Sequence, residues 1–216
     1  MASRKKILEA VLAALLGVAL TGQAYERELS PRSLREAFFL GKDTTFRSGD
    51  FFKGYVRTFP VPKQGVQVAQ IEMGTPFKQI VTRARQAPDG YNPLQAESEY
   101  RRQPPRLIVE VTLWLTPTFP AHSPYTIPAF SPIYFREPSF WQAFQIHLVQ
   151  GGEVAPRGVK GDPFYSCDGD GNCWLAGAVV RLEFDPDQVA SRPTRISVLT
   201  PDGQRVEAEF DLGRLR

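Results

Sequence analysis

The sequence predicts an α+β fold in which a helical N-terminal part packs on a C-terminal β-sandwich. Two observations indicate this division. Before residue 105, three N-cap-plus-proline pairs precede segments whose apolar residues lie three and four positions apart. From Arg106 onward apolar and polar residues alternate, which is typical of half-buried strands. We therefore expect a leader (1–24), a mainly helical part (25–104) and a β-sandwich (105–216).

The helix starts share one local signal. Each pairs a side chain that can accept free amide hydrogens with a proline whose φ angle already suits a helix. The three pairs are Ser30-Pro31, Thr75-Pro76 and Asn92-Pro93. We expect the first helix to end at Gly41, because glycine is frequent just after a helix. A further helical stretch is expected around residues 51–56.

The strands are expected over residues 66–73, 107–115, 140–148 and 178–184, followed by a terminal hairpin. In the first of these the apolar phase shifts near Ala69, which a β-bulge explains. The hairpin turns at Pro201-Asp202-Gly203. Short alternating strands separated by turn signals are typical of a sandwich, and the architecture predicted here is immunoglobulin-like. The Cys…Trp…Cys spacing of antibody domains is absent.

The first 24 residues have the layout of a secretory signal peptide. A basic head at Arg4, Lys5 and Lys6 precedes an apolar run, and small residues precede a cut after Ala24. The run of about 11 residues rises roughly 16 Å as a helix, short of a ~30 Å hydrocarbon core. We therefore expect an exported protein, periplasmic or extracellular, that begins at Tyr25. The alternative is an uncleaved signal anchor, the one case in which we expect membrane attachment.

Charge excludes one class of partner. The formal net charge is +3, of which the leader carries +2, so the chain after it is near +1. No long basic block remains, only the pair Arg101-Arg102 with Arg106 nearby. We therefore expect no nucleic-acid partner.

The two cysteines are expected to form a disulfide. Cys167 and Cys173 are six positions apart, and the residues between them favour a turn that brings two strand ends together. A zinc pair would lack a second pair of ligands, and a redox dithiol normally has two intervening residues.

The turn between the cysteines carries a candidate metal site. Asp168, Asp170 and Asn172 resemble the first half of an EF-hand calcium loop. The pattern breaks at Cys173, where the loop glycine belongs, and at Val179, where the bidentate glutamate belongs. Calcium binding and a simple polar turn both remain open.

A proline-rich segment from Pro117 to Pro138 interrupts the strand pattern with interleaved aromatic residues. Its proline density excludes a central strand and favours extended loop. The segment is either a crossover packed over the sandwich or an aromatic contact surface, and we expect most of its rings to be packed. The candidate contact residues in and beside it are Trp114, Tyr125, Phe130, Tyr134 and Trp141.

A resemblance to other proteins supports the predicted export of this chain. The stretch Arg35–Gly41, the Thr75-Pro76-Phe77 helix start and the terminal hairpin resemble a set of uncharacterised exported bacterial proteins. The resemblance covers most of the chain after the leader and implies export and a shared fold. It implies no activity, cofactor or site.

No catalytic motif or cofactor site stands out. The chain has two histidines, His122 and His147, and lacks a nucleophile elbow, phosphate loop, HExxH site or dinucleotide fingerprint. We therefore expect an exported cell-envelope binding or structural protein whose partner is an envelope protein or glycan. The alternatives are an extracytoplasmic hydrolase and a calcium-stabilised adhesion or carbohydrate-binding module.

Overall fold

The computed structural model describes residues 25–62, 65–116 and 137–216. The expected leader and most of the proline-rich segment lie outside these ranges. The described chain combines helices with two antiparallel sheets, as an α+β protein does. Within the described ranges, no helix is both long enough and apolar enough to cross a membrane.

Between residue 25 and the third strand, the described chain forms four helices. Their bounds are α2 (Pro31–Lys42), α3 (Phe46–Lys53), α4 (Pro76–Gln86) and α5 (Pro93–Arg102). All three predicted N-caps are confirmed. The Ser30 hydroxyl accepts from the Ser33 amide, and the Thr75 hydroxyl accepts from the Lys78 amide. Asn92 forms a capping box with Gln95.

The prediction that Gly41 ends the first helix is wrong. α2 continues to Lys42, and Gly41 is buried where α2 crosses α4. A Cβ atom at Gly41 would lie 2.8 Å from the Ala84 Cβ and would overlap the Val81 carbonyl oxygen. The glycine therefore allows the close approach of two helices.

The strands in the described ranges form one sheet of five and one of four. The five-stranded sheet has the order β1-β2-β3-β7-β6, and the four-stranded sheet has the order β5-β4-β8-β9. The strands of the first sheet are β1 (Val56–Thr58), β2 (Val66–Gly74), β3 (Leu107–Leu115), β7 (Cys173–Phe184) and β6 (Gly158–Cys167). Those of the second are β5 (Glu153–Val154), β4 (Gln145–Val149), β8 (Pro193–Leu199) and β9 (Arg205–Asp211).

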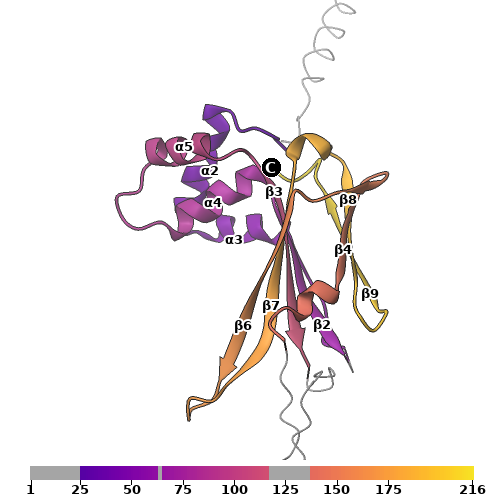
Figure 1. Ribbon diagram of the computed structural model, residues 1–216. Coiled ribbons are helices and arrows are strands. Elements are labelled where there is room, and N and C mark those ends of the chain that lie inside the picture. Colours follow the sequence, from indigo (N-terminus) through magenta and orange to yellow (C-terminus); the bar gives the residue numbers. More distant parts are fainter. Residues whose placement is uncertain (1–24, 63–64, 117–136) are drawn as a thin grey trace, which may run out of the picture.

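The two sheets share one hydrophobic core. It joins fully buried residues of the five-stranded sheet, such as Val109 and Val111, to Ile196 and Val198 of the four-stranded sheet. A second buried cluster lies among the helices. Figure 1 shows the helices gathered on one side of the five-stranded sheet near one end, with the four-stranded sheet on the other side.

The predicted strand pattern holds with two corrections. The bulge in β2 is confirmed by a register shift between Val68 and Gln70. Phe140, expected to begin a strand, instead begins the 3-10 helix η1 (Phe140–Ala143), and β4 starts at Gln145. Val56, expected in a helix, lies in β1. A further 3-10 helix, η2 (Pro186–Gln188), precedes β8.

Residues near the two ends of the described chain join the layers. The Tyr25 amide donates to the Leu212 carbonyl oxygen (3.0 Å), and its side chain is buried in the shared core. The Arg216 guanidinium binds Glu36 of α2 (2.5 Å) and stacks over the Phe77 ring at 4.3 Å. The helices are thereby tied to the sheets through contacts that are distant in sequence.

Candidate binding surface

The five-stranded sheet has an outer face that points away from the four-stranded sheet. On β3 the odd-numbered residues from Leu107 to Leu113 are fully buried, so Trp114 belongs to the opposite, outer face. Trp114 is 46% exposed. It pairs with Gly177 of β7, which in turn pairs with Phe164 of β6, so these three residues form one row across the outer face.

Gly177 allows two rings to meet across β7. The Trp114 and Phe164 rings pack edge to face with their centroids 5.1 Å apart. A Cβ atom at Gly177 would overlap both the Phe164 ring and the Leu113 carbonyl oxygen. The missing side chain is therefore what lets Phe164 lie across the middle strand and reach Trp114.

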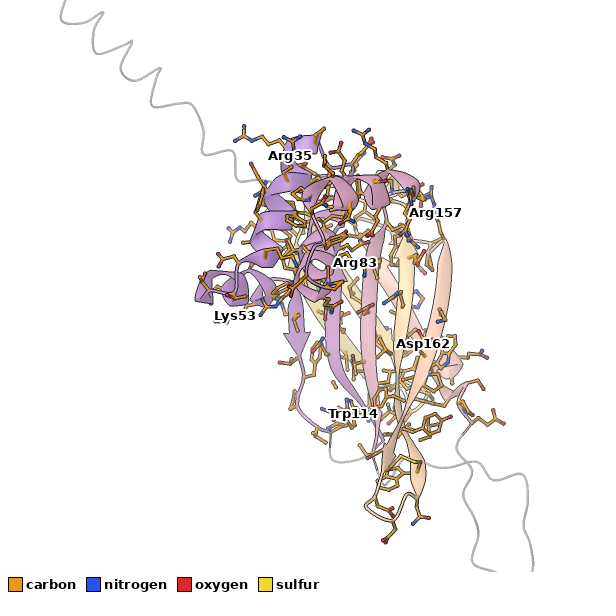
Figure 2. All side chains as sticks on the ribbon, turned by 90° about the vertical axis from the view of Figure 1, so that its left-hand side faces the viewer. Arg35, Lys53, Arg83, Trp114, Arg157 and Asp162 are labelled. Carbon is orange, nitrogen blue, oxygen red and sulfur yellow. A yellow bond between two sulfur atoms is a disulfide. The ribbon has the colours of Figure 1, made fainter. Side chains whose placement is uncertain are left out.

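A third aromatic residue, Trp174, lies on the same face, closer to the tip of the β6–β7 hairpin. Trp174 pairs with Ser166, which is two residues beyond Phe164 on the same strand and hence on the same outer face. Trp174 is 52% exposed. We call Trp114, Phe164 and Trp174 the aromatic shelf. Figure 2 looks onto the outer face, where Trp114 lies near the end of the sheet remote from the helices.

The predicted disulfide is confirmed at the tip of this hairpin. Cys167 and Cys173 are bonded, with their Cα atoms 4.1 Å apart, and they form the strand pair next to Ser166 and Trp174. The turn beyond them projects at the end of the sheet away from the helices (Figure 1). The disulfide thus fixes the two strand ends next to Ser166 and Trp174.

Polar side chains cover the outer face between the shelf and the helices. Arg181 Nε donates to Glu110 Oε1 (2.8 Å), and Lys160 Nζ lies 2.6 Å from Asp162 Oδ1. Thr112 lies in the same row as Asp162, the row next to the shelf. We call these five residues the polar band. In Figure 2, Asp162 lies on the sheet between Trp114 and the helical layer.

A hollow of about 360 Å³ lies where α4 overhangs the outer face. An ion pair between Lys78 of α4 and Glu72 of β2 lies in its wall, and the Lys78 side chain is almost fully buried. Gln70 donates to the same glutamate at 2.9 Å. The wall is charged and its carboxylates already have partners, so it offers no open apolar pocket.

The predicted contact residues are not all brought together. Trp141 packs against Gly161, whose partner Val180 is in the core, so Trp141 lies on the inner side of β6. Trp114 is on the outer side. The two tryptophans therefore lie on opposite faces of the sheet. Tyr125, Phe130 and Tyr134 lie outside the described residues.

In the turn between the cysteines, the Asp168 carboxylate accepts hydrogen bonds from residues of the same turn. Asp168 Oδ1 accepts from the amides of Asp170 (3.0 Å) and Asn172 (2.9 Å), and the Asn172 side chain donates to Asp168 Oδ2 (3.1 Å). The side-chain bond from Asn172, followed by its amide bond, lowers the pKa of Asp168. Across the described part of the chain, no three His, Cys, Asp or Glu residues are grouped as a metal site.

The histidine that the structure describes lies on the other sheet. His147 Nδ1 is 2.6 Å from Glu153 Oε1, which joins β4 to β5. His122 falls outside the described ranges. His147 is therefore not part of the aromatic shelf or of its polar band.

Phe164 and Trp174 were not anticipated from the sequence. Each stands close to a cysteine, and both belong to a hairpin that the disulfide prediction implied. The predicted hairpin was therefore the sequence feature from which these two residues could have been found. Their alignment with Trp114 depends on the pairing of β3, β7 and β6, including a register shift after Phe164.

No protein-family model, curated protein or solved structure matches this chain. The surface is therefore interpreted from its own chemistry.

Proposed function

We propose that this chain is an exported binding protein of the cell envelope and that the aromatic shelf is its contact surface. One observation carries this proposal: Trp114 and Trp174 are each about half exposed on one sheet face, and the Phe164 ring packs against Trp114 on that face. Adjacent exposed aromatic rings leave apolar area in water, and such patches commonly mark interaction sites. Tryptophan is also enriched among residues that dominate binding energy.

We further propose that the two sheets form an immunoglobulin-like sandwich with a helical N-terminal part packed beside it. Two antiparallel sheets around one shared core support this interpretation. The five-stranded sheet includes β1 and β2, which precede residue 104. The helical part and the sandwich are therefore interleaved along the chain.

Export is supported by the layout of residues 1–24 and by the disulfide, since disulfides persist in oxidising compartments. We expect the mature chain to begin at Tyr25. N-terminal sequencing of the protein recovered from the envelope tests this, and an intact leader would indicate a signal anchor.

The contact surface is tested by capture from an envelope extract on immobilised protein. Trp114→Ala and Trp174→Ala are expected to reduce capture at least tenfold. Phe39→Ala is the matched control, because Phe39 is an exposed ring (61%) on α2, in the helical layer. The unfolding free energy of all three variants should stay within about 1 kcal/mol of the wild type, as is usual for exposed positions. Undiminished capture by both tryptophan variants would remove the shelf from the proposal.

A further inference from the structure

We propose that the aromatic shelf binds an uncharged glycan, with sugar rings stacked on Trp114 and Trp174 and hydroxyl groups bonded by the polar band. This inference rests on the proposed function and specifies its ligand. It follows from three properties of the surface: the exposed rings, the hydrogen-bonding groups beside them and the sign of the local charge.

The exposed rings suit the C–H-bearing face of a pyranose. An aromatic ring carries negative charge on its faces and positive charge on its edge. The C–H bonds on one side of a sugar ring are weakly positive, so they pack favourably on an indole face. Trp114 and Phe164 meet edge to face at an interplanar angle of 66°, so neither ring is stacked flat over the other.

The polar band supplies partners for hydroxyl groups. Asp162 lies two residues from Phe164 on β6, about 7 Å along the strand and on the same face. Its side chain is 58% exposed and is paired with Lys160, whose side chain is 73% exposed. A carboxylate beside an ammonium group offers an acceptor and a donor next to each other, which suits neighbouring sugar hydroxyls.

Local charge disfavours an anionic ligand. Among the described residues near the shelf, Glu110, Asp162, Asp168 and Asp170 contribute four negative charges, against two positive charges from Lys160 and Arg181. Both cations are already paired with carboxylates of the band. Phosphate-rich polymers, acidic sugars and acidic peptides would therefore meet net repulsion here.

The shape of the surface favours a glycan over a protein partner. Protein interfaces bury their anchor side chains in well-packed pockets. The hollow beside this face is lined by charged groups such as Lys78 and Glu72. An exposed sheet face that combines rings with hydroxyl-bonding groups instead matches a chain of sugars lying along the sheet.

The first test uses defined probes with the purified full chain. The uncharged hexamers of β-1,4-linked N-acetylglucosamine and of β-1,4-linked glucose are titrated while tryptophan fluorescence is followed, with an anionic hexamer of galacturonate as the charge control. We expect saturable quenching by at least one uncharged hexamer and none by the anionic one. Trp114→Ala and Trp174→Ala should each weaken binding at least tenfold, and Phe39→Ala should leave it unchanged.

The second test identifies the class of ligand without choosing a sugar. Envelope extract is treated either with protease or with periodate, which cleaves vicinal diols, before capture on the immobilised protein. Capture that survives protease supports the glycan: its loss after periodate indicates sugars with vicinal diols, such as β-1,4-linked glucose, and its survival indicates sugars without them, such as β-1,4-linked N-acetylglucosamine. Capture that is lost after protease and survives periodate overturns it, while the tryptophan dependence of capture still supports the proposed function. If capture does not depend on Trp114 or Trp174 at all, both proposals fail.

Discussion

Replacing Gly177 with alanine should weaken the fold sharply, although alanine is small. The new methyl group would overlap the Phe164 ring and the Leu113 carbonyl oxygen. The ring can rotate away, but the carbonyl belongs to the β3–β7 ladder, so β7 must move away from β3. Overpacking of this kind costs about 1–3 kcal/mol, and a weakened ladder hydrogen bond adds about 1 kcal/mol. We therefore expect a loss of about 3 kcal/mol in the free energy of unfolding.

Gly158→Ala is the matched control. Gly158 begins β6 of the same sheet, and no atom lies within 4 Å of the position its Cβ would occupy. We expect its effect to lie between no change and about 1 kcal/mol of stabilisation, because alanine restricts the unfolded chain. Urea unfolding measures both variants, and the midpoint of thermal unfolding of Gly177→Ala should fall by roughly 6–12 °C. If Gly177→Ala unfolds within about 0.5 kcal/mol of Gly158→Ala, the interpretation of the shelf as dependent on this glycine is wrong.

Three further outcomes follow from single groups. Replacing Cys167 and Cys173 together with serine should cost about 2 kcal/mol, since the closed loop is short, and thiol labelling of the unreduced, denatured wild type should find no free cysteine. Tyr25→Phe should stabilise the protein by about 1 kcal/mol in urea unfolding, because the buried Tyr25 hydroxyl has no hydrogen-bond partner among the described residues; destabilisation would contradict this. Burial raises the pKa of Tyr55 from 10.0 to about 12, so its contribution to stability should be intact below pH 10 and lost as the pH rises toward 12. Urea unfolding from pH 9 to 11 should record that decline, and a flat profile would count against it.

Local signals explain what the sequence could predict of the fold. The helix starts at Ser30, Thr75 and Asn92 depend on a cap and a proline within a few residues, and all three are present. The alternation of apolar and polar residues over β3 could also be predicted, because burial of one face of a strand imposes a period of two. Helix caps and strand alternation can be predicted without knowing which residues distant in sequence lie nearby in the fold.

The errors have a common physical cause. Gly41 was interpreted as a helix end, whereas its role is set by α4, some 40 positions later in the chain. Trp114 and Trp141 were grouped because they flank one segment, yet Trp141 packs on Gly161 of β6, on the other side of the sheet. Tertiary pairing, which the sequence pattern does not contain, decides both cases.

The contacts of Arg216 have a consequence for the order in which the chain can fold. Its guanidinium binds Glu36, 180 positions earlier, and its main chain exchanges hydrogen bonds with the hydroxyl of Tyr55, 161 positions earlier. A polypeptide that emerges amino end first cannot make these contacts until synthesis reaches residue 216. Native closure therefore depends on contacts between residues far apart in the sequence, which form more slowly than local ones. For the export that we propose, a delay of this kind would leave the chain unfolded enough to pass through a translocation channel.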